Sequence, residues 1–557
     1  MVKNDLAALI QQAIAAAQAA GDLPPFDPPE VVVEHPKEAG HGDYDSPVAM
    51  KLARAAKMPP LKIAQAIAKH LPAADFLAGV EVAPPGFLNF TLSEHWLAQQ
   101  VAAILEEGEH FGQVDIGRGK RVQVEFVSVN PTGPIHIGHA RGAALGDSLA
   151  RLLAAAGYQV QREYYFNDAG SQMDKFYHSL YARYCQVLGR DEPVPDDGYH
   201  GNYMLDLARD IVAEQGNRFL ALPREQAIAA LAPIGAERMI GIIKEDLARM
   251  GVQFDCWFLE RSLYSGGQYA KIMALLQERG FLEKKDGAIW FTSSTLGQDK
   301  DNVVVRSSGE PGYFASDIAY HYNKFIERGF DWVINIWGAD HQGHVPRMKA
   351  MMQALGLDPA RLTLIIMQLV TLKRGGEVVR ISKRTGDIIT LRDVLDEVGP
   401  DAVRFLLISR AADAQMDFDL DVAKAQSEEN PVFYVQYAHA RIASIQRYAK
   451  EQLKASVAAE GDLSLLTHPA ELALIRQMLR LPELVEETAT RLEPHHLPHY
   501  AQELAASFHS FHKQCRVVSS DPADAALSAA RLKLVQAARI VLANTLYLMG
   551  MTAPEQM

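Results

Sequence analysis

The sequence predicts an α/β protein with a parallel sheet in its central part, an α+β domain before it and an all-helical domain after it. Three observations predict this order. In the middle of the chain, short β-branched runs alternate with helical patterns, as in sheets built from strand–helix–strand units. Before residue 115, helical patterns occur together with a hairpin pattern. After about residue 390, the apolar spacing is almost wholly helical.

The composition is that of a globular protein with several domains. The chain has 557 residues, enough for three or four domains, with 48% hydrophobic and 22% charged residues. The formal net charge of −13 argues against non-specific binding of DNA or other nucleic acids. It leaves room for a local basic groove, which is sufficient for specific phosphate contacts.

Cysteine usage and apolar runs indicate the expected compartment. Three cysteines lie far apart and form no C-x-x-C pair, so we expect no zinc site and no disulfide framework. The N-terminus shows no signal-peptide pattern, and the apolar run 540–549 is too short to span a bilayer. We therefore expect a cytoplasmic protein with no membrane partner.

The first part of the chain predicts a small separate domain, residues 1–114. Helices are expected at 6–20, 48–56 and 61–70, with a loop at 40–44. A short strand is expected at 31–33. The runs 80–83 and 87–92 flank Pro84-Pro85-Gly86 and predict a hairpin. Lysines and arginines at 51, 54, 57, 62 and 69 form either a basic face or an ordinary solvated surface.

The central part opens with a strand, a tight turn and a helix. Residues 122–129 alternate like a buried strand, and N-P-T-G-P at 130–134 ends it. A helical pattern then runs over 136–156, as in the first half of a nucleotide-binding, Rossmann-type unit. Further strands are expected at 158–166, 288–292, 302–305, 332–337 and 362–370, and helices at 175–190 and 318–328. The strand-poor block 172–262 is interpreted as an insertion between two halves of one sheet.

Two histidines lie at the start of the helix 136–156. His136 and His139 are three residues apart, so they share one face of its first turn. Free N–H groups at a helix start favour a phosphate, and two imidazoles add hydrogen bonds as phosphoryl charge redistributes. Gly138 leaves room for a flat base on the backbone. The alternative is an ordinary helix start with a packing glycine.

The string H-I-G-H at 136–139 resembles the first motif of class I aminoacyl-tRNA synthetases. With E-F-V-S-x-N-P-T-G-P before it and A-R-G-A after it, the stretch resembles the arginyl-tRNA synthetase family. H-G-D-Y at 41–44 and P-G-F-L-N-F at 85–90 resemble that family's N-terminal domain. The resemblance implies three domains: a tRNA-binding domain (1–114), a class I catalytic domain with a connective insertion (115–410) and a helical anticodon-binding domain (411–557).

A second motif is expected at R-I-S-K, residues 380–383, where the family has K-M-S-K. The resemblance implies that Ser382 and Lys383 take part in catalysis and that Lys383 binds ATP phosphates. Arg380 replaces the usual first lysine of this motif. Lysine and arginine are not equivalent at a phosphate, so this position departs from the family pattern. A basic surface loop is the alternative interpretation of the same string.

The resemblance also assigns substrate residues one by one. It implies that Glu125, Ser128, Asn130, His139, Tyr313, Asp317 and Gln342 bind arginine, and that His136, Gly138, His139, Gly338, Asp340 and Lys383 bind ATP. Carboxylates suit the forked contacts of a guanidinium. Each assignment has a plainer alternative: an ion pair with a neighbouring arginine for Glu125, a helix N-cap for Asp317, core packing for Tyr313 and a capping role for Asp340.

The C-terminal part carries cations beside aromatics. No acidic residue occurs over 431–450 or 525–554. Aromatic rings beside cations suit unstacked RNA bases, and the resemblance assigns tRNA contacts to Tyr434, Tyr437 and Arg441. Amphipathic core packing is the alternative for most apolar residues there. F-H-S-F-H at 508–512 also resembles the family's anticodon-binding domain.

The resemblance implies the activity of a ligase. Arginine reacts with ATP, supplied with Mg²⁺, to give arginyl-adenylate, and the terminal ribose 2′-hydroxyl of tRNA(Arg) then takes the arginyl group. We expect a monomer. One rival is a simple nucleotidyltransferase, which also uses H-x-G-H. Another is a tRNA-binding protein without activity, which the intact His136, Gly138, His139 and Lys383 argue against.

Overall fold

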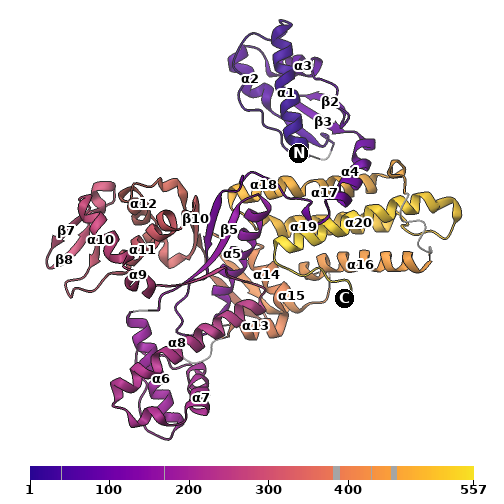
Figure 1. Ribbon diagram of the computed structural model, residues 1–557. Coiled ribbons are helices and arrows are strands. Elements are labelled where there is room, and N and C mark those ends of the chain that lie inside the picture. Colours follow the sequence, from indigo (N-terminus) through magenta and orange to yellow (C-terminus); the bar gives the residue numbers. More distant parts are fainter. Residues whose placement is uncertain (39, 169, 380–388, 428, 453–460) are drawn as a thin grey trace.

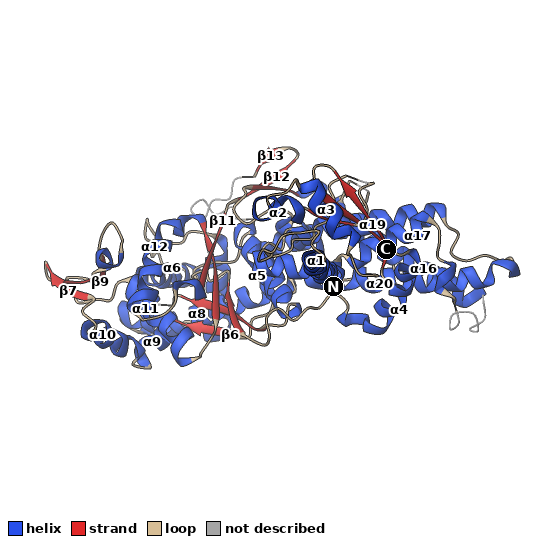
Figure 2. Ribbon diagram, turned by 90° about the horizontal axis from the view of Figure 1, so that it is seen from above, coloured by secondary structure: helices blue, strands red, loops and turns tan. Residues whose placement is uncertain are grey.

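The computed structural model describes all residues except 39, 169, 380–388, 428 and 453–460. It confirms the expected fold class. Seen from above, a small antiparallel lobe and a helical bundle lie at opposite ends of the molecule, with the parallel sheet between them (Figure 2). The N-terminal domain stands apart at the top of Figure 1, above the bundle.

The N-terminal domain packs helices on one small antiparallel sheet with the order β1-β3-β2. Its elements are α1 (Val2–Ala19), β1 (Tyr44–Ser46), α2 (Val48–Ala56), α3 (Pro60–Lys69), β2 (Leu77–Ala83), β3 (Phe87–Leu92) and α4 (Glu94–Glu107). The hairpin is confirmed, but the strand expected at 31–33 is wrong. Tyr44, expected in a loop, instead begins β1, which pairs with β3. Directly after the segment 31–33, Glu34 forms one isolated β-bridge, with Asp45.

The N-terminal domain is joined to the C-terminal bundle by packing of α4 on the bundle helices and by polar contacts. Arg476 donates from Nε to Asp43 Oδ1 over 2.6 Å. Glu483 accepts from the Tyr44 hydroxyl over 2.8 Å and lies 3.0 Å from Nε2 of His35. The H-G-D-Y segment, expected in a tRNA-binding domain, thus supplies the residues that dock this domain onto the bundle.

The central sheet has five parallel strands in the order β11-β10-β4-β5-β6. They are β4 (Arg121–Glu125), β5 (Gln159–Phe166), β6 (Cys256–Leu259), β10 (Trp332–Gly338) and β11 (Leu362–Met367). From β4 the chain adds β5 and β6 on one side, and later β10 and β11 on the other. The order therefore reverses between β4 and β10. In open α/β sheets, ligands bind at the carboxyl ends of strands at such a switch point.

The helix after β4, α5 (Ile137–Ala155), is buried on nearly all sides. It packs on the parallel sheet and is covered by helices of the C-terminal half (Figure 1). The expected strand 122–129 ends earlier than predicted, at Glu125, because Val127 and Ser128 have φ of 68° and 43°. A left-handed backbone cannot continue a ladder, so the chain turns there.

Close packing of α5 against the end of β4 requires a glycine. A Cβ on Gly146 would come within 2.1 Å of Cγ of Phe126. We expect Gly146→Ala to destabilise the protein by about 1–3 kcal/mol, because overpacking displaces the ring. Differential scanning calorimetry checks this as a lower Tm. Gly241 of α8 (Arg224–Arg249) has no atom within 4 Å of such a Cβ, so Gly241→Ala is the matched control. An unchanged Tm for Gly146→Ala would contradict the packing argument.

Two insertions leave the parallel sheet. The first carries α6 (Ser171–Val187), α7 (Asn202–Gln215) and α8, and forms the lobe at the bottom of Figure 1. Strand β6, which was not predicted, follows α8 and pairs with β5, so the block 172–262 holds a strand of the main sheet. Of the described helices, α8 alone is long and apolar enough to cross a membrane. It contains Pro233 and packs along α6, so this is weak evidence for a span.

The second insertion is the antiparallel lobe. It holds α9 (Arg261–Ser265), α10 (Gln268–Glu278), β7 (Leu282–Lys285), β8 (Ala288–Phe291), β9 (Asn302–Val305) and α11 (Tyr313–Tyr322). Helix α12 (Val345–Ala354) follows β10 and packs against the same lobe. Strands β8 and β9 were predicted at these positions. They form a separate sheet, β7-β8-β9, and do not join the parallel one. The expected helix 318–328 begins earlier, at Tyr313, and its last turn is a π-helix, Asn323–Glu327.

The remaining elements connect the sheet to the bundle and form the bundle itself. They are β12 (Val370–Arg374), β13 (Glu377–Val378), α13 (Leu391–Val398), α14 (Pro400–Ile408), β14 (Met416–Asp419), α15 (Leu420–Lys424), α16 (Pro431–Gln452), α17 (Pro469–Leu479), α18 (Leu481–Arg491), α19 (His496–Gln514) and α20 (Ala525–Leu548). The expectation that strands stop near residue 390 is wrong, because β14 pairs in parallel with β12. The helical C-terminal domain is confirmed.

Candidate active site

The turn between β4 and α5 presents the two predicted histidines together. His136 is the N-cap of α5, and its Nδ1 accepts a hydrogen bond from the Gly138 N–H over 3.2 Å. A ring nitrogen that accepts carries no proton, so the neutral ring has its proton on Nε2 and can donate from there. The rings of His136 and His139 stack with centroids 3.6 Å apart. The start of α5 thus offers backbone and imidazole donors on one face.

Glu125 ends β4 at the switch point, directly opposite Asn335 of β10. Its Oε2 lies 2.5 Å from Nζ of Lys324, which is fully buried and also donates to Oδ1 of Asn335 over 3.0 Å. Burial lowers the pKa of Lys324, and the nearby Glu125 and Glu163 raise it. The alternative role expected for Glu125 was an ion pair with a neighbouring arginine. The ion pair is present, but the partner is a lysine. The charge of Glu125 is therefore balanced within the protein.

The same buried cluster continues into α11. The amide of Asn335 lies 2.9 Å from Nε2 of His321, whose Nδ1 lies 2.7 Å from the carbonyl of Asp317. Burial holds the pKa of His321 well below its usual value, so the ring is neutral. These contacts fix α11 against the carboxyl end of the sheet. They thereby fix the two predicted arginine-binding residues, Tyr313 and Asp317, which that helix carries.

Asp317 lies in the second turn of α11, so the N-cap alternative is wrong. The side chain is partly buried, with 32% of its surface open to solvent. Burial raises the pKa of Asp317 to about 7; Arg347 lowers it, while Glu125 and Glu260 raise it. Nη2 of Arg347 lies 3.8 Å from Oδ2 of Asp317. A carboxyl with this pKa binds a cation strongly in its ionised form.

Tyr313 opens α11 and is 50% exposed, which excludes core packing as its role. Its hydroxyl would lie 3.5 Å from a Cβ on Gly170, so the side chain reaches toward the turn after β5. That turn leads out of the neighbouring strand of the sheet. Tyr313 is thus placed to cover a ligand held at the strand ends.

Ser128 and Asn130 fix the turn after β4 to its neighbours. Oγ of Ser128 accepts from the backbone N–H of Tyr165 over 3.1 Å, which ties the turn to β5. Nδ2 of Asn130 donates to Oε1 of Gln172 in α6 over 2.6 Å. Both residues lie at the carboxyl edge of the sheet, as expected.

Two residues predicted to bind ATP, Gly338 and Asp340, and one predicted to bind arginine, Gln342, lie at the end of β10 and in the turn after it. Gly338 is the last residue of that strand, and Asp340 and Gln342 lie in the 3₁₀ turn Ala339–His344, both exposed. Asp340 caps no helix, so its capping alternative is wrong; its Oδ2 lies 3.5 Å from Nε2 of His341. A Cβ on Gly338 would come within 2.7 Å of Oδ1 of Asp340, so only a glycine at position 338 leaves room for this carboxylate.

Arg380, Ser382 and Lys383 of the second motif lie outside the described residues. The chain on both sides of them is fixed. On one side, the N–H of Val379 donates to the carbonyl of Leu372 over 2.8 Å. On the other, Thr390 forms a bridge with His136, and the Leu391 N–H donates to Ile135 over 2.7 Å. Thr390 and Leu391 therefore lie beside the first motif.

Lys324 and Arg347 were missed by the sequence analysis. A signal for Lys324 existed, because Asp317, His321 and Lys324 follow at intervals of four and three, which puts them on one face of a helix. The π turn at 323–327 then carries Lys324 inward, and such turns are frequent at functional sites. Nothing in the sequence joins Arg347 to Asp317, thirty residues earlier in the chain.

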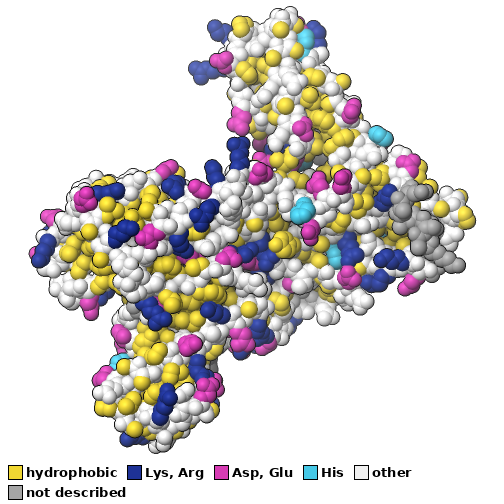
Figure 3. Space-filling view, viewed as in Figure 1, with side chains coloured by type: hydrophobic (Ala, Val, Ile, Leu, Met, Phe, Trp, Pro, Cys, Tyr) yellow, Lys and Arg dark blue, Asp and Glu magenta, His cyan; other side chains and the backbone are white. Residues whose placement is uncertain are grey.

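The predicted tRNA-binding residues lie on α16. Tyr437 is exposed and stacks on Phe433 with centroids 6.0 Å apart, and the Arg441 guanidinium lies 5.8 Å from the Tyr437 ring centroid. Tyr434 is partly buried, with its ring 4.9 Å from that of His509 in α19. On the face seen in Figure 3, cationic and acidic side chains are interspersed over all lobes.

Among the described residues, one group of three could hold a metal ion. It consists of Glu493, His495 and His496 at the junction of α18 and α19. His496 Nε2 lies 3.1 Å from Oε2 of Glu493, a contact of i,i+3 spacing that needs no ion. The group belongs to the helical bundle and not to the turn that carries His136.

The parallel sheet with its switch point, the H-I-G-H helix start and the helical bundle define a class I aminoacyl-tRNA synthetase. Three family models match in chain order: "Arginyl tRNA synthetase N terminal domain" at residues 4–92, "tRNA synthetases class I (R), catalytic domain" at 100–426 and "DALR anticodon binding domain" at 435–557. The chain belongs to the arginyl-tRNA synthetase family.

Individual relatives agree with this assignment. The chain is 55% identical over 557 residues to an arginine–tRNA ligase of Dehalococcoides mccartyi, covering 100% of this chain and 99% of the relative. It is 49% identical over 561 residues to the arginine–tRNA ligase of Moorella thermoacetica, with the same coverage. Among solved structures, the arginyl-tRNA synthetase of Thermus thermophilus matches with a TM-score of 0.76 and 25% identity, and covers both chains fully.

Proposed function

We propose that the chain activates L-arginine with ATP to give arginyl-adenylate and diphosphate, and then transfers the arginyl group to the 2′-hydroxyl of the terminal adenosine of tRNA(Arg). One observation carries this proposal. The helix start with His136 and His139, the end of β4 and the Asp317 face of α11 converge on the carboxyl edge of one parallel sheet, at its switch point.

The test is charging of total tRNA with each amino acid in turn. We expect the purified chain to attach arginine and no other amino acid, in a reaction that consumes ATP and releases AMP. A nucleotidyltransferase would form a nucleotide adduct without charging tRNA. A tRNA-binding protein without activity would retain tRNA on a filter and release no AMP. Either result would overturn the proposal.

We propose that Asp317 is the charge partner of the arginine guanidinium, with Tyr313 covering the alkyl stem. Glu125 shares the pocket, but its charge is already balanced by Lys324. Asn130, Ser128 and Gln342 complete the arginine site, where neutral oxygens and amides suit a substrate with several donors. His139 serves both substrates, because it faces the turn on which they meet.

ATP is proposed to lie along the start of α5. Its phosphates meet the imidazole and backbone donors of His136 and His139, and its base lies over Gly138. The ribose lies against Gly338 and Asp340. Mg²⁺ enters with the nucleotide as part of the substrate. Ser382 and Lys383 are proposed to neutralise the leaving diphosphate, since Thr390, seven residues after Lys383, forms a bridge with His136.

The wider assignments are proposals of the same kind. Residues 1–114 bind tRNA, 115–410 carry the chemistry, with the connective insertion near 172–262, and 411–557 bind the anticodon region through Tyr434, Tyr437 and Arg441. We propose a cytoplasmic monomer without a resident metal, a membrane partner or a DNA partner.

Arginine binding should depend on pH through Asp317. Its pKa of about 7 means that the carboxyl is ionised above that pH and neutral below it. The charged form binds the guanidinium, so affinity is full above pH 7 and is lost as pH falls. We expect the KM for arginine at pH 6 to be about tenfold higher than at pH 8. Steady-state kinetics across this range check it, and a flat profile for wild type would contradict it.

A further inference from the structure

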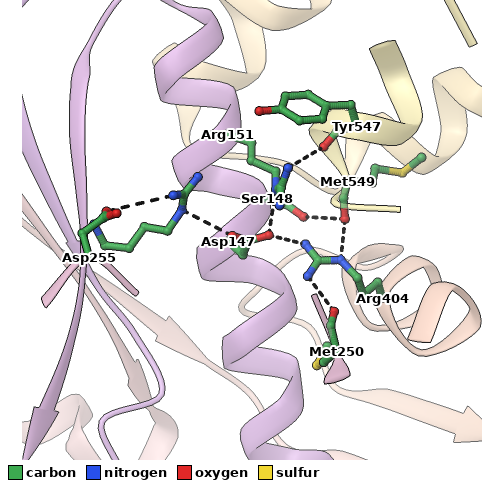
Figure 4. Close-up of polar contacts among 9 residues, drawn as sticks. Asp147, Ser148, Arg151, Met250, Asp255, Arg404, Tyr547 and Met549 are labelled. Atoms are coloured by element: carbon green, nitrogen blue, oxygen red, sulfur yellow. Dashed lines mark hydrogen bonds and ion pairs between the residues drawn. The ribbon is translucent and has the colours of Figure 1, made fainter. Parts of the chain in front are cut away.

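A buried ionic cluster lies midway along α5, away from the proposed substrates (Figure 4). Asp147 is almost wholly buried, and its carboxylate contacts three guanidinium groups. Oδ2 lies 2.8 Å from Nε of Arg151 and 2.6 Å from Nη2 of Arg404, and Oδ1 lies 3.3 Å from Nε of Arg162. These arginines come from α5, α14 and β5. One carboxylate thus connects three elements of the chain.

Arg404 is at the centre of this cluster, because its fully buried guanidinium bonds Asp147 and two backbone carbonyl groups at once. Nε donates to the carbonyl of Met549 over 2.7 Å, and Nη1 donates to that of Met250 over 3.2 Å. Met250 and Met549 are the C-caps of α8 and α20. Helix C-termini carry partial negative charge, so one cation holds the ends of two helices against α5.

The end of α20 fits this arrangement closely. Gly550 follows Met549 with φ of 68°, and a Cβ there would come within 2.0 Å of Nη2 of Arg404. Ser148 Oγ donates to Met549 over 3.4 Å. The Arg151 guanidinium lies 4.9 Å from the ring of Tyr547. The last helix of the C-terminal domain is therefore joined to the helix that begins beside His136.

We propose that Arg404 is a positioning residue for the reaction, which sets the place of α5 and hence of His136 and His139. Asp147 lies eleven residues after His136, about 16 Å along the helix axis. Asp147 lies on the same continuous helix that begins at His136, so a shift at Asp147 displaces both histidines. A displacement of about 1 Å in a catalytic group costs up to roughly 100-fold in rate. This inference rests on the proposed role of His139.

The test is a double-mutant cycle between Arg404 and His139 in the full chain, with arginine, ATP and total tRNA as substrates. If Arg404 acts through the start of α5, Arg404→Met lowers kcat by roughly 30-fold or more with His139 present, and by less than about threefold in the His139→Ala background. KM values for tRNA and arginine change by less than about threefold. Arg404→Lys keeps a positive charge beside Asp147 but loses the forked guanidinium, so we expect an intermediate kcat.

Arg531 supplies the matched control. It is a largely buried arginine of α20 that bonds inside the bundle, to Glu471 over 2.6 Å and to the carbonyl of Arg516 over 2.9 Å. Arg531→Met should leave kcat per folded molecule unchanged in both backgrounds. Circular dichroism at the assay temperature gives the folded fraction, and Arg404→Lys carries the cycle if Arg404→Met does not fold.

The outcomes separate the two proposals. Equal fold-losses from Arg404 substitution in both backgrounds would show a purely structural role and overturn the positioning role. A normal kcat in folded Arg404→Met would do the same. A normal kcat in His139→Ala alone would overturn the proposed role of His139, and the positioning role with it.

Discussion

Replacing His136 or His139 with alanine is expected to lower the rate of arginyl-adenylate formation by about 100- to 1,000-fold, or ~3 kcal/mol in the activation free energy. Each ring lies at the start of α5, and the two stack 3.6 Å apart. Each variant loses a donor that is fixed before the reaction begins, and water entering the vacated space does not replace that order. The effect therefore falls on kcat more than on the KM for ATP.

Arginine-dependent pyrophosphate exchange in the presence of tRNA measures this step. His110→Ala is the control, because that side chain is 69% exposed and lies in the turn Gly108–His110, before β4 and the helix start that carries His136. Its exchange rate should match wild type. Near-normal exchange by both His136→Ala and His139→Ala would remove these residues from the mechanism.

Asp317→Asn is expected to raise the KM for arginine by about 10- to 100-fold while the KM for ATP stays within about threefold. The amide keeps the shape of the side chain but loses the charge that attracts a guanidinium. It also removes a group whose pKa is about 7, so the pH dependence of the arginine KM should disappear. That second effect separates a lost charge from a disturbed fold.

Both KM values should be measured from pH 6 to pH 8. Asp358→Asn is a suitable control, because Asp358 is an exposed cap of the turn Pro359–Arg361 and asparagine caps equally well. An unchanged KM for arginine together with a raised KM for ATP would place Asp317 at the nucleotide instead.

The sequence predicted those parts of the fold that depend on local patterns. The expected helix 136–156 agrees with α5 to within one residue at each end, because apolar spacing and the N-P-T-G-P turn act over a few residues. Strand 122–129 was drawn too long because the left-handed φ of Val127 and Ser128 is imposed by packing of the turn against β5. Strand β14 was missed because four residues acquire strand structure only by pairing with β12.

The candidate site divides in the same way. The histidines were found because their spacing puts them on one helix face. The neutralisation of Glu125 by Lys324 was not found, since the two residues are 199 positions apart and meet only through the fold. The sequence offered an ion pair with an arginine as one alternative for Glu125, but only the fold shows that the partner is Lys324.

The bonds between the N-terminal domain and the bundle also affect how the protein is made. Asp43 and Arg476 are 433 positions apart. At ribosomal rates of about 5–20 residues per second, the first domain leaves the ribosome roughly 20–90 s before its partner exists. During that interval, the polar groups of His35, Asp43 and Tyr44 form hydrogen bonds to water instead. Because these contacts are ionic and hydrogen-bonding, their polar groups stay hydrated in the meantime, and the two ends of the chain join only when synthesis is almost complete.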